Sequence, residues 1–169
     1  MKRFLLILLS VLLLLTMFGC TQEEALEKPV NFYYRRSNIE YKQEGGVIAA
    51  EQRESLGHET DVRYLLSEYL KGPASGGLQQ VFPEGMTIVS MYYEDKNIKM
   101  TFSFHLAELT GMDLTIACAC LTMTVMELTG AESVQIYAAG TLLDEYQSIT
   151  MDKNSLLLLD TSAEVKYQK

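Results

Sequence analysis

The sequence has no tryptophan and, among its 169 residues, only three prolines, three cysteines and two histidines. Metal sites need clustered histidine, cysteine or carboxylate ligands, whereas His58 and His105 each stand alone. Cys118 and Cys120 lie two positions apart in a predicted helix, so their side chains point to nearly opposite faces and cannot bond to each other. A Cys-x-Cys metal or redox site would need further ligands close by, and the sequence offers none. We therefore expect two buried, apolar thiols, no metal site and no cofactor.

Basic residues are also scarce. Lysine and arginine number 14 against 22 aspartates and glutamates, which gives a formal net charge of -8. Phosphate backbones repel a chain of this charge, and no basic patch interrupts it. Nucleic acid is therefore excluded as a partner, whereas a basic protein or a cation-rich cell wall suits the charge.

The usual catalytic signatures are missing as well. No pattern gathers two carboxylates into one cleft, and no Gly-x-Ser-x-Gly or Cys–His arrangement is present. The run from Ser75 to Leu78 is glycine-rich, but no Lys-Ser or Lys-Thr pair follows it as in a phosphate-binding loop. The run from His58 to Asp61 precedes a predicted helix and is expected to cap it. We predict that the chain is not an enzyme.

Residues 1–19 have the pattern of a secretory signal. Three residues, Met1-Lys2-Arg3, make a basic start, and an apolar run then extends from Phe4 to Phe18. The segment Met17-Phe18-Gly19-Cys20 resembles the bacterial lipobox, with a bulky phenylalanine where a small residue is commoner. We predict a lipoprotein signal peptide over 1–19 and a diacylglycerol on the thiol of Cys20.

Two acyl chains would anchor the protein stably to a membrane. The alternative is an uncleaved signal anchor, although the apolar run is shorter than the roughly 20 residues that a spanning helix needs. Both alternatives place the domain on the extracytoplasmic face of the cell membrane. Cleavage would also remove Lys2 and Arg3, which leaves 12 basic residues against 22 acidic ones and a formal charge near -10.

Beyond the signal, the chain divides into parts of different composition. We predict a charged, lipid-anchored stalk over 20–29, an N-terminal strand and link over 30–60, a domain over 61–143, and a C-terminal extension with a candidate strand over 144–169. Within the extension, the run from Leu156 to Leu159 is the candidate strand.

The domain opens with an amphipathic helix. Thr60 or Asp61 is a candidate cap, and the Gly72-Pro73 pair ends the pattern. Apolar residues recur between them at helical spacing: Val62, Leu65, Leu66, Tyr69 and Leu70.

Further elements follow in a clear order. Residues 87–94 and 98–104 alternate around a polar turn at 95–97, which predicts a β-hairpin. The longest apolar segment after the signal, Met112 to Leu128, predicts a helix that is apolar almost all round, and 134–138 alternate again as a strand. The sequence therefore predicts an α+β fold, in which two helices pack on one face of a small mixed sheet and an extra strand stands at the amino end.

Aromatic residues are too many for one core face, because neighbours along a strand point to opposite sides. Two interpretations stay open: the surplus rings form a protein interface, or terminal elements cover them. The residues concerned are Phe32, Tyr33, Tyr34, Tyr41, Tyr92 and Tyr93.

The middle of the chain resembles the GerMN domain of sporulation and spore-germination proteins. The resemblance rests on a helix ending in Leu-x-Gly-Pro, then a Gly-Leu pair, then a Pro-x-Gly turn before the hairpin. It extends over about half of the chain, and only Ser103 matches the family pattern after the second hairpin strand. The residues that carry it are Leu65, Leu66, Leu70, Gly72, Pro73, Gly77, Leu78, Pro83 and Gly85.

The resemblance implies an αββαβ core similar to the ring-building modules of sporulation secretion assemblies. It names no catalytic residue, and its glycines and prolines shape turns. It therefore implies a protein-interaction or assembly module on an envelope lipoprotein, with an envelope protein or a second copy as partner and a role in sporulation or germination. The alternative function is a lipoprotein that binds a small ligand or peptidoglycan.

Overall fold

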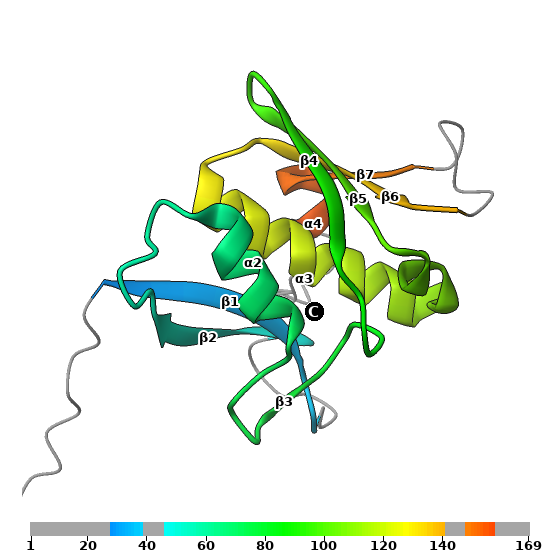
Figure 1. Ribbon diagram of the computed structural model, residues 1–169. Coiled ribbons are helices and arrows are strands. Elements are labelled where there is room, and N and C mark those ends of the chain that lie inside the picture. The colour runs from blue at the N-terminus through cyan, green and yellow to red at the C-terminus, as the bar shows by residue number, and fades with distance from the viewer. Residues whose placement is uncertain (1–27, 39–45, 141–147, 158–169) are drawn as a thin grey trace, which may run out of the picture.

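The computed structural model describes residues 28–38, 46–140 and 148–157. The predicted signal peptide, Cys20, most of the stalk and Tyr41 lie outside these residues. The elements in chain order are β1 (Pro29–Arg36), β2 (Ile48–Glu54), α2 (Val62–Leu70), β3 (Leu78–Gln79), β4 (Ile88–Glu94), β5 (Asn97–Phe102), the 3-10 helix η1 (Phe104–Glu108), α3 (Gly111–Thr129), β6 (Ser133–Ala138), β7 (Ile149–Asp152) and α4 (Lys153–Leu157) (Figure 1).

The strands form two separate sheets. One has three antiparallel strands in the order β2-β1-β3, and the other has four strands in the order β4-β5-β6-β7. The predicted hairpin is confirmed as β4 and β5, which are antiparallel and joined through Asp95 and Lys96. Strand β6 is parallel to β5, and α3 makes the crossover between them. The α+β class and the αββαβ order are thus confirmed.

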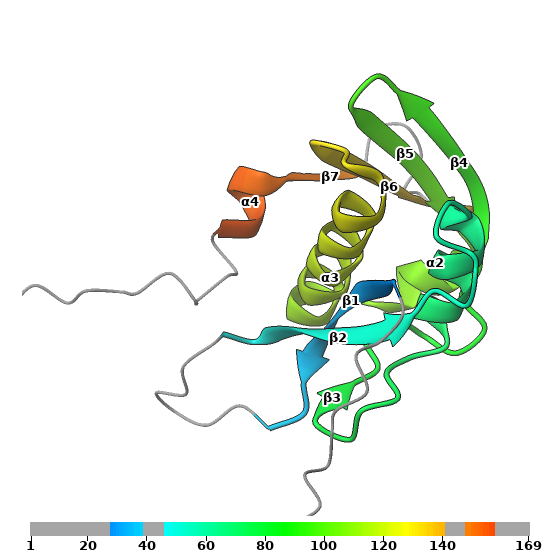
Figure 2. The same cartoon turned by 90° about the vertical axis from the view of Figure 1, so that its left-hand side faces the viewer.

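Helix α3 lies between the two sheets (Figure 2). It contacts β1 on one side and β6 and β7 on the other, and α2 also packs against it. Every residue from Ile116 to Thr122 is buried, which accounts for a segment that is apolar almost all round. The length and composition of α3 would also suit a membrane-crossing helix, but its burial between two sheets is that of a core helix. The sequence predicted one sheet. The structure has a further, three-stranded sheet, which covers the other side of this helix.

Helix α2 begins and ends as its sequence predicts. Asp61 caps it, because one carboxylate oxygen accepts a hydrogen bond of 3.0 Å from the backbone N–H of Tyr64. Its apolar side is buried and supplies Tyr69 to an aromatic cluster. The ring of Tyr69 lies 4.9 Å from Tyr34, 5.1 Å from Phe82 and 5.5 Å from Phe32 between centroids. This cluster connects α2 to the three-stranded sheet.

Two strand predictions are wrong: the end of the second hairpin strand and the candidate strand that starts at Leu156. Strand β5 ends at Phe102, and Phe104 begins η1 with its side chain exposed to solvent. Within the C-terminal extension the strand is β7, whereas Leu156 belongs to α4. The helix starts there because Asp152 accepts a hydrogen bond of 2.7 Å from the backbone N–H of Ser155, which alternation of apolar residues does not reveal.

The burial of α3 gives a prediction for its two thiols. Burial raises the pKa of Cys118 and the pKa of Cys120 to about 12, so neither thiol is ionised near neutral pH. In the Cys20→Ser variant, Ellman's reagent at pH 8 is expected to label neither cysteine in the folded protein and both in denaturant. The number of labelled thiols per chain is the measurement. Rapid labelling of the folded protein would show that α3 is not enclosed.

Candidate functional site

The predicted motif residues lie along one continuous stretch from α2 to the start of the hairpin. Leu65, Leu66 and Leu70 are in the core. Leu78 belongs to β3 and pairs with Arg36 of β1. Further along, the backbone N–H of Met86 donates to the carbonyl of Pro83 at 3.2 Å, which closes the Pro-x-Gly turn.

Glycine at position 72 is required for two reasons. Its φ is +101°, a backbone conformation that residues with a side chain rarely adopt. A Cβ there would lie 2.9 Å from Nε2 of Gln80, so the Gln80 side chain would have to shift. The same Gln80 amide donates to the carbonyl of Leu70 at 3.0 Å. The Gly-Pro pair therefore ends α2 and lets the next loop fold back against the helix.

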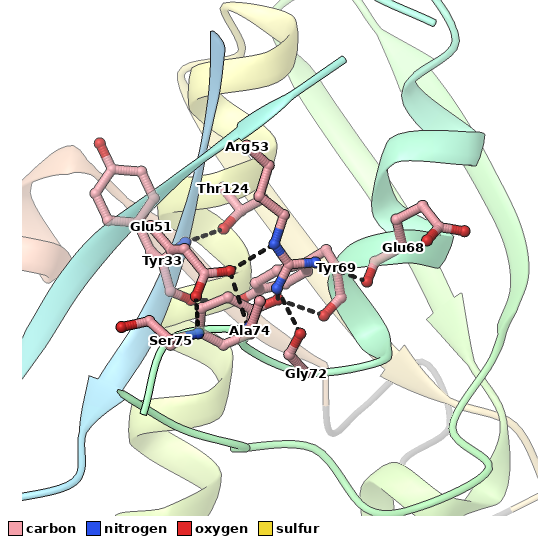
Figure 3. A network of polar contacts seen from close by, with 10 residues as sticks. Tyr33, Glu51, Arg53, Glu68, Tyr69, Gly72, Ala74, Ser75 and Thr124 are labelled. Atoms are coloured by element: carbon pink, nitrogen blue, oxygen red, sulfur yellow. Dashed lines mark hydrogen bonds and ion pairs between the residues drawn. The ribbon is translucent and has the colours of Figure 1, made fainter. Parts of the chain in front are cut away.

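A partly buried ion pair holds this loop against the three-stranded sheet (Figure 3). Glu51 and Arg53 lie two residues apart on β2, and their Oε1 and Nε atoms are 2.5 Å apart. The Glu51 carboxylate also accepts hydrogen bonds from the backbone N–H groups of Ser75 at 2.7 Å and Ala74 at 3.2 Å. Arg53 donates to the carbonyl of Gly72 at 2.5 Å. We call these five residues the loop clamp.

The aromatic cluster packs against the Arg53 side of the loop clamp. The Arg53 guanidinium lies 5.2 Å from the ring centre of Phe32 and 5.8 Å from that of Tyr34. The Tyr34 hydroxyl donates to the carbonyl of Tyr69 at 2.7 Å, and the Tyr69 hydroxyl donates to the carbonyl of Tyr33 at 2.8 Å. Burial raises the pKa of Tyr34 and Tyr69, so both stay neutral donors. The donors and acceptors of the clamp are hydrogen-bonded to one another, so the role of the clamp is to hold the loop in place.

One serine–histidine contact lies next to the hairpin. Ser103 and His105 meet, with Oγ 3.0 Å from Nδ1, and the backbone N–H of Thr87 donates to the same hydroxyl. Ser103 lies at the start of η1, so this contact closes a turn. No carboxylate contact orients His105, and no group of three or more metal-ligating side chains occurs in the part of the chain that the structure describes.

The aromatic residues divide into two groups. Phe32 and Tyr34 are buried, and Tyr33 meets α3, where its backbone N–H donates to the Thr124 hydroxyl at 3.0 Å. By contrast, Tyr92 and Tyr93 on β4 are 65% and 56% exposed. The rings of β1 thus pack against the core helices α2 and α3, whereas the rings of the hairpin remain at the surface.

Strand β4 is an edge of the four-stranded sheet, and no described strand pairs with its outer side. Tyr92 lies opposite Lys99 on the outer face of the sheet, whereas Tyr93 lies opposite the buried Ile98. The edge thus presents an aromatic ring on each face, with Val89 exposed beside them. We call these three residues and the free side of β4 the tyrosine edge.

Two surface hollows lie near the motif loop. One of about 360 Å³ is lined by Arg35, Phe82 and Asp113 among others, and Arg35 pairs there with Asp113 at 3.0 Å. The second, of about 570 Å³, lies between Lys71, Glu84 and Met86. Their walls mix apolar surface with charges of both signs, so neither selects one kind of ligand.

Comparison with known proteins now identifies the family. The family model for Germane, described as sporulation and spore germination, matches residues 31–144, which is more than half of the chain. The chain belongs to the Germane family. The GerMN resemblance predicted from the sequence is confirmed.

Solved structures agree with this family fold. The tandem GerMN domains of the sporulation protein GerM from Bacillus subtilis match 82% of this chain at 20% identity and a TM-score of 0.54. This match takes up 48% of that two-domain chain. At such identity the likeness shows the fold alone.

Two further structures are similar at lower scores. The first GerMN domain of GerM matches 68% of this chain and 84% of its own, at 18% identity and a TM-score of 0.48. A Clostridium perfringens protein, provisionally described as a lipoprotein, matches 79% of this chain and 94% of its own, at 14% identity and a TM-score of 0.48. No protein with a curated description matches the chain.

Within this Germane domain, Glu51 is the residue that sequence reasoning missed. An acid and a base two residues apart on a strand suggest a solvated pair, and only the fold brings the Ser75 and Ala74 N–H groups to the carboxylate. Burial alone would raise the Glu51 pKa, but these hydrogen bonds and Arg53 hold it below its ordinary value.

The clamp predicts a pH-dependent loss of stability in Glu51→Gln. Removing the charge-assisted bonds is expected to cost about 2 kcal/mol of unfolding free energy near neutral pH. Because the folded pKa is depressed, the glutamate stabilises the fold above its unfolded pKa of about 4.3, and this contribution is lost as the pH falls through the folded value. The difference between wild type and variant should therefore shrink in acid.

Urea denaturation at several pH values checks this prediction. Glu54→Gln is the matched control, because Glu54 lies on the same strand with an exposed side chain. A stability difference for Glu51→Gln that is small, or that is equal at all pH values, would contradict the clamp.

Proposed function

We propose that this Germane protein is a non-catalytic, lipid-anchored envelope protein whose domain binds another envelope protein through the tyrosine edge. It acts on the extracytoplasmic face of the cell membrane, in sporulation or spore germination. Membership of a family described by those processes supports the setting. The lipobox-like segment ending at Cys20 supports the anchor.

The single observation that carries the binding role is the tyrosine edge itself. An edge strand offers unpaired N–H and C=O groups to another chain, and soluble proteins usually protect such edges with charge, proline or a covering segment. Strand β4, with the sequence IVSMYYE, has one charged residue, at its end, and no proline. Tyrosine is a favoured interface residue because it contributes apolar area together with a hydroxyl.

The charge of the chain narrows the range of partner surfaces that it can bind. With residues 1–19 removed, the formal charge near -10 favours a surface rich in lysine and arginine. Strand addition on β4 would supply main-chain hydrogen bonds, and the two tyrosines would supply side-chain contacts on either face of the added strand. An extended basic segment of an envelope protein fits both requirements.

The lipid anchor is tested by Cys20→Ser. Without the thiol no diacylglycerol can be attached, so the protein is expected to move from the membrane fraction to the medium or the soluble wall fraction. Labelling of cells with radioactive palmitate and fractionation provide the measurement. Palmitate incorporation that persists in the variant would mean that Cys20 is not the site.

The interaction is tested by the double variant Tyr92→Lys/Tyr93→Lys. Two ammonium groups on the edge would repel a basic segment, remove the aromatic contacts and lower recovery of the partner at least tenfold, which corresponds to about 1.4 kcal/mol. Crosslinking in intact cells, followed by capture of the tagged, full-length protein, measures this recovery. Because both side chains are more than half exposed, the fold should persist.

The matched control is Met112→Lys, which alters another exposed apolar residue at the start of α3. Equal recovery with both variants would contradict a role for the tyrosine edge. Recovery of peptidoglycan fragments in place of a protein would instead support the alternative of a wall-binding lipoprotein, which muropeptide titration followed by tyrosine fluorescence then tests directly.

A further inference from the structure

The loop between β2 and α2 contains a leucine in an unfavourable conformation. Leu56 has a φ of +51° and Gly57 a φ of +82°, and the backbone N–H of His58 donates to the carbonyl of Ser55 at 2.9 Å. Positive φ at both central residues is the pattern of a type I′ turn, in which Asn-Gly is strongly preferred. Leucine gains nothing locally from this position, because its Cβ is crowded there.

The side chain of Leu56 is also unsupported by the fold. It is 71% exposed, the highest value among the large apolar residues of the described chain, and it is not part of the core cluster. A strained backbone that presents an exposed apolar side chain is unfavourable for the isolated domain, and a contact outside the domain would account for it.

This loop lies at the end of the domain where the chain enters from the predicted anchor (Figure 1). Pro29, the first residue of β1, is paired with Glu54, the last residue of β2. The Lys28 ammonium also pairs with the Glu59 carboxylate at 3.0 Å, which holds the incoming chain against the loop.

The distance from the anchor to the loop is short. Seven residues lie between Cys20 and Lys28, so the eight Cα–Cα steps between them span at most about 28 Å when fully extended. A lipid on Cys20 would therefore hold Leu56 within reach of the bilayer surface at a high effective concentration. The opposite end of the domain points away, because β1 and α3 run antiparallel: Asn31 bonds to Glu127 near the chain entry, and Arg35 bonds to Asp113 at the far end.

We propose that Leu56 inserts into the membrane interface and, together with the lipid on Cys20, fixes the orientation of the domain on the bilayer. This inference rests on the proposed lipid anchor. The binding partner of Leu56 is a lipid surface, because this exposed leucine lies at the end of the domain that the anchor holds near the membrane. Glu54 and Asp61 flank the loop and oppose strongly anionic headgroups, so docking is shallow and is stronger on zwitterionic vesicles.

The absence of tryptophan makes a clean test available. The chain from Cys20 to Lys169 with Leu56→Trp is coupled through Cys20 to maleimide-bearing phosphatidylcholine vesicles; Cys118 and Cys120 are buried and do not compete. On tethering, the tryptophan emission is expected to shift to shorter wavelength and to be quenched by brominated acyl chains. Met112→Trp, at the far end of the domain, should show neither effect. Equal responses at the two positions, or no response at position 56, would overturn the proposal.

A second variant separates docking from folding. Leu56→Asn suits the positive φ, so it is expected to raise the melting temperature while lowering the docked fraction about tenfold, since the apolar contact is lost. Paramagnetic broadening of the amide signals of 55–58 by spin-labelled lipid measures that fraction. Unchanged broadening in this variant would contradict the proposal. Because the tether is chemical, failure here is distinct from failure of the anchor, which Cys20→Ser tests in cells.

Discussion

The need to bury helix α3 on all sides is the constraint on which the rest of the structure depends. A helix packed on one sheet hides a single face, whereas seven consecutive buried residues from Ile116 to Thr122 leave no face for water. The four-stranded sheet covers one side, and β1 with its neighbours covers the other. The N-terminal strands are therefore part of the domain core, and the family match that begins at residue 31 includes them.

The three-stranded sheet is joined to the rest of the fold through charge as well as apolar contact. Glu51 and Arg53 extend from β2 to the loop that follows Gly72, and the Arg53 guanidinium rests on the aromatic cluster that Tyr69 of α2 completes. A partly buried pair of this kind is costly to desolvate and stabilises a fold only when its remaining hydrogen-bonding capacity is met. Here backbone N–H and C=O groups meet it, so the geometry of the loop and the pairing of β2 depend on each other.

With the core enclosed in this way, the surface features that remain lie at different places on the domain. The tyrosine edge belongs to the four-stranded sheet, and Leu56 belongs to the end where β1 begins. An orientation fixed at the membrane would leave β4 free to meet a partner, so anchoring and binding would not compete.

The sequence by itself determined the local elements: Asp61 and Gly72 bound α2, alternation marks the hairpin, and the glycine and proline series identifies the family, because each depends on neighbours along the chain. Only the tertiary structure decided that 48–54 is a strand, since its hydrogen bonds come from β1. It likewise decided that Glu51 is clamped, that Tyr33 packs against α3 while Tyr92 stays exposed, and that Phe104 leaves the sheet. These outcomes depend on which distant segments meet, and neither periodicity nor propensity encodes that contact.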